Sequence, residues 1–312
     1  MRTLFSTKAH LALLLICPLF LAACQSENGR KQNPAAWRAS DDKRRLGTKI
    51  DPIWRLVAHS EVIVVGKPNV STWQLCTKPG KYVEIPVKSV EVIKGSAPDP
   101  VEVTYFNEAV FYSPSPQQLA KSNRKKYLLF LTRAGDEFSS QAELYFAGSS
   151  LVALTPFEEG LVKLVATEVE EQKQLLANFD KLFPTNEVPY YQEVKNLLNA
   201  VTRKADARRA LDKLEALGTN AVPALILLMD DRRSFSLGTL ALENKSKNAF
   251  EAFRQYGPKQ IVDAVAAILN QITGESFGAI YSGGTETARA HEVEGWRIYL
   301  CHSKGKTVKS GP

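Results

Sequence analysis

The 312-residue sequence has few of the side chains that usually mark metal, cofactor or disulfide sites. It contains four cysteines, four histidines and two methionines, and it lacks a Cys-x-x-Cys pair, a Gly-x-Gly-x-x-Gly run and a serine nucleophile elbow. Four cysteines are too few for a scaffold built on disulfides. The apolar fraction of 44% is typical of a globular protein and excludes wholesale disorder. We therefore expect about two folded domains, and we predict a protein that is not an enzyme and uses no metal or cofactor.

Long apolar runs are also scarce, and the one at the N-terminus predicts an export signal over residues 1–23. Arg2 and Lys8 precede an apolar core over 11–20, and Ala22 and Ala23 supply the small residues of a cleavage site. The core is too short for a membrane span, which needs about 20 residues. The segment therefore predicts an exported protein rather than one that crosses the bilayer by a helix.

The end of this signal resembles the lipobox of bacterial lipoproteins in its run Leu21-Ala22-Ala23-Cys24. The resemblance implies that Cys24 becomes the first mature residue and carries a diacylglyceryl thioether and an acylated amine, with chains such as palmitate. Several acyl chains make a stable anchor in the cell envelope. Because Gln25 follows the cysteine, the resemblance implies an outer-membrane lipoprotein facing the periplasm if the source is Gram-negative. The alternative is an ordinary secretory signal with a chance cysteine at this position.

The net charge of +7 is concentrated at the two ends of the chain. Residues 1–50 hold nine Lys and Arg against three Asp and Glu, and the tail 304–312 adds three lysines. Residues 51–303 are left with a net charge of −2. This distribution predicts a flexible basic tether over 24–49 and a basic tail, and it gives no case for a nucleic-acid partner.

Residues 50–167 contain short apolar segments that are typical of a small antiparallel β-barrel. A short helix after Asp51 is followed by strands expected at 61–65, 82–92, 101–106, 126–132, 144–146, 151–154 and 161–165, with a long loop over 113–125. Within the second strand, apolar residues occupy odd positions up to Val87 and even positions at Val90 and Val92. This slip of one residue predicts a β-bulge.

Three of these runs, Ala58–Gly66, Val90–Gly95 and Tyr127–Leu131, resemble the netrin-like, OB-type barrel. Tissue inhibitors of metalloproteinases belong to this family, and they chelate the protease zinc through the free amine of an N-terminal cysteine. Here the candidate Cys24 is predicted to be acylated and lies about 27 residues before the first expected element. The resemblance therefore implies the barrel, and the zinc-chelating mechanism is not carried over.

From residue 168 to 303 the apolar residues recur at helical spacing, which predicts an all-α segment. Ala210–Met229 aligns without a gap with Ala249–Ile268, and both copies predict a helix, a glycine turn and a second helix. The first copy resembles a HEAT-type repeat. That resemblance implies stacked helical hairpins with a shared core, made by Leu211, Leu214, Leu217, Gly218, Phe250, Phe253, Tyr256 and Gly257. Together the two segments predict an α+β protein, an OB-type barrel followed by a HEAT-like helical domain.

Further helices are expected over 170–183, over 190–203 and over 286–302. The last of these begins after Thr285 as N-cap and points Val293, Trp296 and Leu300 inward. Glycines at 283 and 284 precede this cap, and we interpret them as a turn rather than as an anion site.

The histidines and remaining cysteines of the mature chain are poor candidates for catalysis. His59, His291 and His302 are not spaced as zinc ligands, and we expect each to be solvated or to cap a helix. Cys301 and His302 are adjacent and point in different directions, which is poor geometry for a nucleophile and its base. Cys76 and Cys301 either pair as a disulfide or remain separate thiols, and the sequence leaves both open.

These features predict a membrane-anchored lipoprotein that binds a protein or glycan partner without catalysis. The alternative is an inhibitor or regulator of an extracellular or periplasmic hydrolase that acts through the barrel loops. A third hypothesis is a hydrolase whose carboxylates converge only in the fold.

Overall fold

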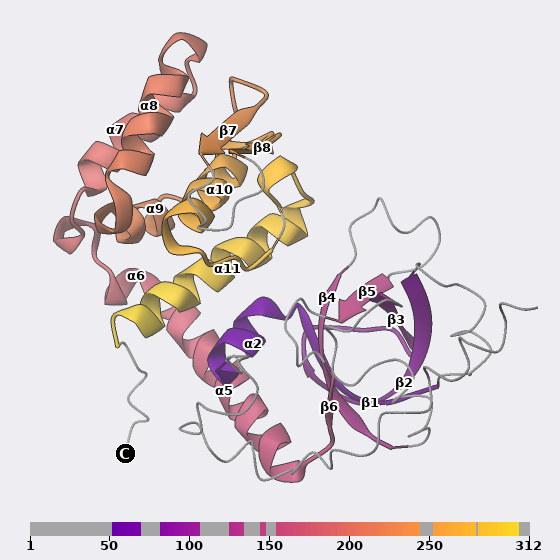
Figure 1. The fold of residues 1–312 in the computed structure, drawn as a ribbon. Coiled ribbons are helices and arrows are strands. Elements are labelled where there is room, and N and C mark those ends of the chain that lie inside the picture. Colours follow the sequence, from indigo (N-terminus) through magenta and orange to yellow (C-terminus); the bar gives the residue numbers. More distant parts are fainter. Residues whose placement is uncertain are drawn as a thin grey trace, which may run out of the picture. The chain divides into compact units, whose positions relative to one another are not determined.

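The computed structural model describes residues 52–69, 82–106, 125–133, 144–147, 154–243, 252–278 and 280–305. The signal and tether predicted over 1–49, with Cys24, lie outside these ranges, as do Cys76, Phe250, most of the tail and nearly all of the loop expected over 113–125. Residues 49–312 form one compact unit. This unit combines helices and β-sheet, so the chain is an α+β protein (Figure 1). Within the described ranges, no helix has both the length and the apolarity needed to cross a bilayer.

Six strands form one sheet with the pairing order β1-β2-β3-β5-β4-β6, and β1 also pairs with β4. The pairings are antiparallel except between β3 and β5, which run parallel, so the expectation of a wholly antiparallel arrangement is wrong at this pair. The strands are β1 (Val62–Pro68), β2 (Tyr82–Lys94), β3 (Val101–Phe106), β4 (Tyr127–Arg133), β5 (Leu144–Ala147) and β6 (Leu154–Pro156).

Strand β2 contains the β-bulge that its sequence predicts. Its register against β1 shifts where Val65 pairs with Glu91 and the next residue, Gly66, pairs with Ser89. Before this shift Val87 is fully buried, whereas beyond it Val90 is 48% exposed. The extra residue therefore turns the apolar face of the strand from the core to the surface.

Two helices, α2 (Ile53–His59) and α5 (Glu159–Ala177), pack against one another and contact the sheet. Helix α5 replaces the strand expected over 161–165, and that prediction is wrong. Leu161, Val165, Val169 and Gln172 are buried at spacings of three and four residues, which is the period of a helix. The domain boundary expected between residues 167 and 168 consequently falls inside α5.

The helical part continues with short elements joined by turns. They are α6 (Phe179–Leu182), η3 (Thr185–Glu187), α7 (Tyr191–Val201), α8 (Lys204–Ala216), η4 (Gly218–Ala221) and α9 (Val222–Leu227). Helix α7 confirms the prediction over 190–203. In the first repeat copy Leu211 and Leu214 are buried, Leu217 is half-buried, and Gly218 has the left-handed backbone predicted for it, with φ +59°.

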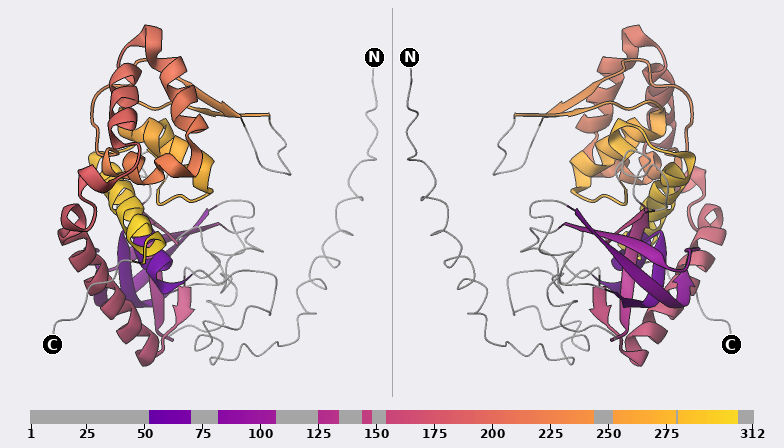
Figure 2. Two further views of the ribbon diagram at one scale, coloured as in Figure 1. Left: turned by 90° about the vertical axis from the view of Figure 1, so that its left-hand side faces the viewer. Right: turned by 90° about the vertical axis from the view of Figure 1, so that its right-hand side faces the viewer.

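The second repeat copy does not form the expected pair of helices. Strand β8 (Phe253–Tyr256) pairs with β7 (Leu240–Glu243) in an antiparallel hairpin that projects from the helices (Figure 2). Phe253 is 56% exposed, and Gly257 has no left-handed backbone. The core role of Phe253, the cap role of Gly257 and the all-α character of this segment are therefore wrong. Tyr256 is half-buried and packs against Tyr281 with ring centroids 5.4 Å apart.

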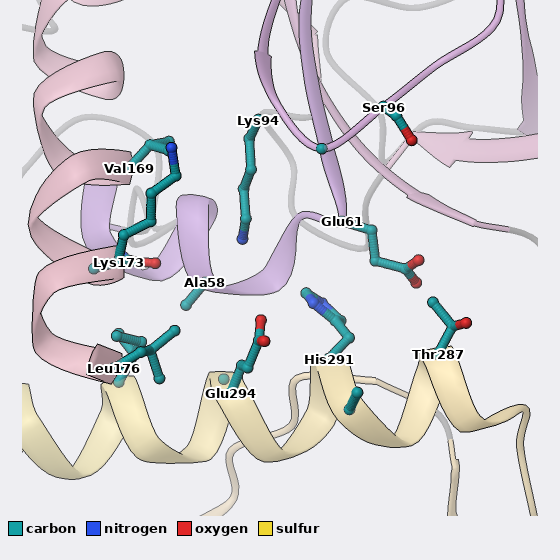
Figure 3. A pocket seen from close by; sticks show the side chains of 15 residues that line it. Ala58, Glu61, Lys94, Ser96, Val169, Lys173, Leu176, Thr287, His291 and Glu294 are labelled. Carbon is teal, nitrogen blue, oxygen red and sulfur yellow. The ribbon is translucent and has the colours of Figure 1, made fainter. Parts of the chain in front are cut away.

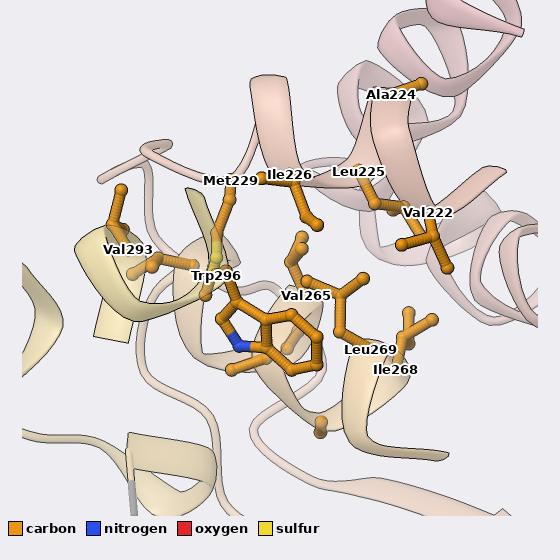
Figure 4. Close-up of a cluster of buried hydrophobic side chains, with 14 of the residues drawn as sticks. Val222, Ala224, Leu225, Ile226, Met229, Val265, Ile268, Leu269, Val293 and Trp296 are labelled. Carbon is orange, nitrogen blue, oxygen red and sulfur yellow. The ribbon is translucent and has the colours of Figure 1, made fainter. Parts of the chain in front are cut away.

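The second half of the repeat persists, because α10 (Ile261–Thr273) occupies the position that α9 has in the first copy. Helix α10 precedes η5 (Ile280–Ser282) and the long α11 (Glu286–Ser303). Thr285 caps α11 as predicted, since its Oγ1 accepts a hydrogen bond from the amide of Ala288 at 3.1 Å. Trp296 of α11 is fully buried among apolar side chains of α9 and α10 (Figure 4).

A buried ion pair joins α10 to α11. Nε and Nη2 of Arg289 donate to the two carboxylate oxygens of Asp263 at 2.8 and 3.0 Å. The same carboxylate accepts hydrogen bonds from the backbone amides of Lys259 and Gln260, both at 3.0 Å, which caps the start of α10. The Asp263 side chain is wholly buried and that of Arg289 is 6% exposed. Four hydrogen bonds thus compensate the desolvation of the Asp263 charge.

Candidate functional site

An open groove of about 590 Å³ lies where α2, β2, α5 and α11 meet (Figure 3). Helix α5 lines it with Val169, Gln172, Lys173 and Leu176, which share one helical face. Helix α11 lines the other side with Thr287, Ala290, His291, Glu294 and Ile298, also at spacings of three and four residues. The end of β2 contributes Lys94, Gly95 and Ser96. The groove therefore combines apolar walls with a small number of charged groups.

Lys94 is the central cation of this groove. Its Nζ donates a hydrogen bond to the carbonyl oxygen of Val57 near the C-terminal end of α2, at 2.7 Å, where helix geometry favours a positive charge. Burial lowers the pKa of Lys94 to about 8, although the carboxylates of Glu294 and Glu61 act to raise it. Nζ makes no other hydrogen bond to the described residues, so two of its three ammonium hydrogens can serve a ligand or water.

Two histidines lie beside Lys94: His291 is buried, His59 is half-buried, and both are held in the neutral form. Burial and the charge of Lys94 together lower the pKa of His291 to about 3. Burial, with the charges of Arg55 and Lys94, lowers the pKa of His59 to about 4. Nε2 of His291 lies 3.1 Å from the carbonyl oxygen of His59. Because a carbonyl oxygen only accepts, the neutral His291 ring has its hydrogen on Nε2. The His59 ring stacks on Phe277 with centroids 4.7 Å apart.

The expectation that each histidine is solvated or caps a helix is wrong for His291, which is 8% exposed. His302 stacks on Trp54 with ring centroids 4.5 Å apart. In the described part of the chain, no group of three or more His, Cys, Asp or Glu side chains is placed to hold a metal ion.

The carboxyl of Glu292 is buried on the opposite side of α11 from Glu294 and does not line the groove. Its Oε1 accepts a hydrogen bond from Nε1 of Trp296 at 2.7 Å. Burial raises the pKa of Glu292 to about 7, and hydrogen bonds from Trp296 and from the backbone of Phe277 offset part of this effect. A side chain at Gly278 would collide with Oε2, so the backbone closes this carboxyl off from solvent.

We expect Glu292→Gln to change the pH dependence of stability. In the unfolded chain this carboxyl ionises near pH 4.5, whereas in the fold it ionises near pH 7. Ionisation therefore costs the wild type stability as pH rises from 4.5 to 7, by up to about 3 kcal/mol. The glutamine variant has no such cost, so its stability relative to wild type should increase between pH 5 and pH 8. Urea unfolding at both pH values measures this, and a constant difference would contradict the assignment.

The other predicted site residues do not converge on the groove. Cys301 is buried in the helical core, and its pairing with Cys76 stays a prediction. The glycines before Thr285 form the turn that begins α11, with Gly283 at φ +99°. Lys94 is not among the predicted site residues, and its one local signal in the sequence is its position directly before Gly95 at a strand end. Lys94 becomes a groove residue only because the fold places α11, almost 200 residues further along the chain, beside it.

The fold and the groove can be compared with known proteins at three levels. Searches against protein-family models, curated proteins and solved structures find no match. A functional hypothesis for this chain therefore depends on its own residues.

Proposed function

We propose that this protein is a membrane-anchored lipoprotein of the bacterial cell envelope that binds a partner protein in its groove without catalysis. The single observation behind this proposal is the open groove between α5 and α11, with Lys94 at its centre. Ligand sites commonly combine apolar walls with a few placed polar groups. The proposed anchor is the acylated Cys24, and the tether over 24–49 would let the folded unit reach partners at some distance from the membrane.

The sheet supports a finer proposal, that residues 62–156 make a small barrel of the OB type. Its support is the set of pairings, which run from β1 through β2, β3, β5 and β4 and return to β1. The bulge in β2 is a second support, because bulges bend the strands of small barrels. In this proposal the barrel holds Lys94 rigidly at the end of β2.

The groove fits an extended peptide segment of the partner. The half-buried Leu176 of α5 and the exposed Ala290 of α11 offer apolar contact, while Val169 and Ile298 form the buried floor beside them. The remaining donors of Lys94 suit a carbonyl or carboxylate of that segment, and the exposed carboxylate of Glu294 suits a basic side chain or an amide. Neither charge has a salt-bridge partner among the described ion pairs within 4.0 Å, so both remain available to a ligand.

The test is capture of partners from detergent extracts by the full-length protein and by groove variants. Ala290→Trp should fill the groove and Glu294→Lys should reverse its exposed charge, and each should reduce capture of a specific partner at least tenfold. Both positions are solvent-exposed, so folding should be unaffected. The matched control is Glu171→Lys, an exposed position of α5 that does not line the groove.

Two results would contradict the proposal. One is the absence of any specific partner under several solubilisation conditions. The other is a partner captured equally well by wild type, Ala290→Trp and Glu294→Lys, since binding would then use a different surface.

A further inference from the structure

A second cavity, of about 510 Å³ and wide open to solvent, lies at the turn between α6 and α7, apart from the groove. Tyr190 and Tyr191 line it together with the polar side chains of Thr185, Asn186, Gln192 and Glu193. These four polar residues are exposed. Within the described residues the side chains of Thr185, Asn186 and Glu193 have no hydrogen-bond partner, while Gln192 donates to Oδ1 of Asn196 at 3.0 Å. The cavity thus joins aromatic surface to an array of free donors and acceptors.

Tyr190 combines an exposed ring with an unusual backbone. It is 44% exposed, which leaves a large part of the side chain open to solvent. Its backbone is left-handed, with φ +61° and ψ +7°, and it is the one described non-glycine residue with a positive φ. A left-handed backbone is unfavourable for most residues with a Cβ. Glycine, and among the others asparagine, adopts it with a smaller loss of stability. Folding stability therefore does not explain a tyrosine here, and such outliers tend to occur at binding sites.

Tyr191 lines the same cavity and is held in place by the helical core. It is half-buried and packs against the helical core, whereas its neighbour Tyr190 faces solvent. The carbonyl of Tyr190 accepts a hydrogen bond from the amide of Val194 at 2.8 Å, which ties the strained residue to the first turn of α7. The aromatic ring of Tyr190 is therefore presented on a backbone that the helix holds in place.

We propose that this cavity binds a carbohydrate. A sugar ring has an apolar face formed by its C–H groups, which stacks on an exposed aromatic ring, and a rim of hydroxyls that both donate and accept hydrogen bonds. Tyrosine offers that flat apolar surface with a polar end. Asn186 and Gln192 supply both donors and acceptors, Thr185 supplies a hydroxyl, and Glu193 accepts from two hydroxyls at once. A purely apolar peptide would leave these polar groups without partners, which is unfavourable.

The experiment uses the full-length protein in a detergent without a sugar headgroup. Calorimetric titration with the trisaccharides of β-1,4-linked N-acetylglucosamine, β-1,4-linked glucose and α-1,4-linked glucose tests soluble sugars, and co-sedimentation with purified cell-wall polysaccharide tests an envelope polymer. We expect binding in at least one arm, and which arm binds distinguishes a free sugar from a polymer. Saturation transfer from the protein should mark the C–H face of the bound sugar.

Three variants separate sugar binding from folding. Tyr190→Asn removes the ring while favouring the same backbone, so it should weaken binding at least tenfold with a melting temperature that is unchanged, within about 2 °C, or higher. Tyr190→Phe keeps the ring and should retain most of the binding. Phe157→Asn removes an exposed aromatic ring outside the cavity and should leave binding unchanged.

The inference would be overturned if neither the trisaccharides nor the polysaccharide bind, or if Tyr190→Asn binds as tightly as wild type. It would also be overturned if Tyr190→Asn abolishes capture of a polypeptide but no sugar binds, because the cavity would then recognise protein. The groove variants Ala290→Trp and Glu294→Lys should leave sugar binding intact, so failure of this inference is distinguishable from failure of the groove proposal.

Discussion

Asp263→Ala is expected to lower the free energy of unfolding by about 3–5 kcal/mol, the usual effect of removing one member of a buried ion pair. The substitution would leave the Arg289 guanidinium, 6% exposed, without the two hydrogen bonds that compensate its burial. It would also remove the cap on the amides of Lys259 and Gln260 at the start of α10. The loss should appear in urea unfolding as a lower midpoint with an unchanged slope.

A double-mutant cycle tests whether the ion pair itself is responsible. Arg289→Met should cost less than Asp263→Ala, because the Asp263 carboxylate keeps its two backbone donors. The variant with both substitutions should be more stable than the sum of the single losses predicts, because no buried charge then lacks a partner. Glu286→Ala is the control, since Glu286 is 64% exposed and meets Arg289 only at Nη1, its other contacts being the surface groups of Arg232 and Gln260, so its effect should be much smaller. Additive losses at Asp263 and Arg289 would contradict the proposed coupling.

Cys24→Ser is expected to move the protein from the membrane fraction to the soluble fraction of the cell envelope. The prediction follows from the proposed acylation of Cys24, because the variant would lose a thioether-linked anchor of several acyl chains. The basic cluster Lys43-Arg44-Arg45 would remain and provide only salt-sensitive attraction to anionic lipid. Fractionation before and after a high-salt wash measures the change, and mass spectrometry of the N-terminal peptide of wild type should show the acyl chains.

Two controls make the anchor prediction specific. Cys17→Ser lies within the predicted signal and Cys76→Ser lies in the mature chain, and both variants should remain with the membrane. If Cys24→Ser also stays in the membrane fraction after high salt, the lipobox interpretation is wrong. If wild type is soluble, the ordinary secretory signal is the correct alternative.

Local patterns in the sequence were sufficient for the elements whose apolar period is unambiguous. The helix over 191–201, the start of α11 after Thr285 and the bulge in β2 all follow from spacing or from a single capping residue. The same kind of pattern was misleading where a run fits two periods. Leu161 to Val165 is a short apolar run of the length of a strand, and only its continuation through Val169 and Gln172 indicates α5.

The second repeat copy shows the limit of spacing as evidence. Phe250, Phe253 and Tyr256 have the same three-residue spacing as their counterparts in α8, yet residues 253–256 pair with β7 as a strand. Phe253 is then left on the surface, and only α10 keeps the burial that the repeat predicts. Spacing alone did not show which of these apolar residues would be buried in the fold.

The sequence by itself determined what depends on short-range chemistry: the charged ends, the Thr285 cap of α11 and the left-handed Gly218. The export signal and the lipid site at Cys24 stay predictions of the same kind. The tertiary structure decided what depends on residues far apart in the chain. It brings Lys94 beside Glu294, and the carbonyl of His59 to within 3.1 Å of His291. Burial among these distant residues lowers the pKa of Lys94 and keeps both histidines neutral, because desolvation disfavours charge. No local pattern contains that information, since the environment of each group is supplied by other segments.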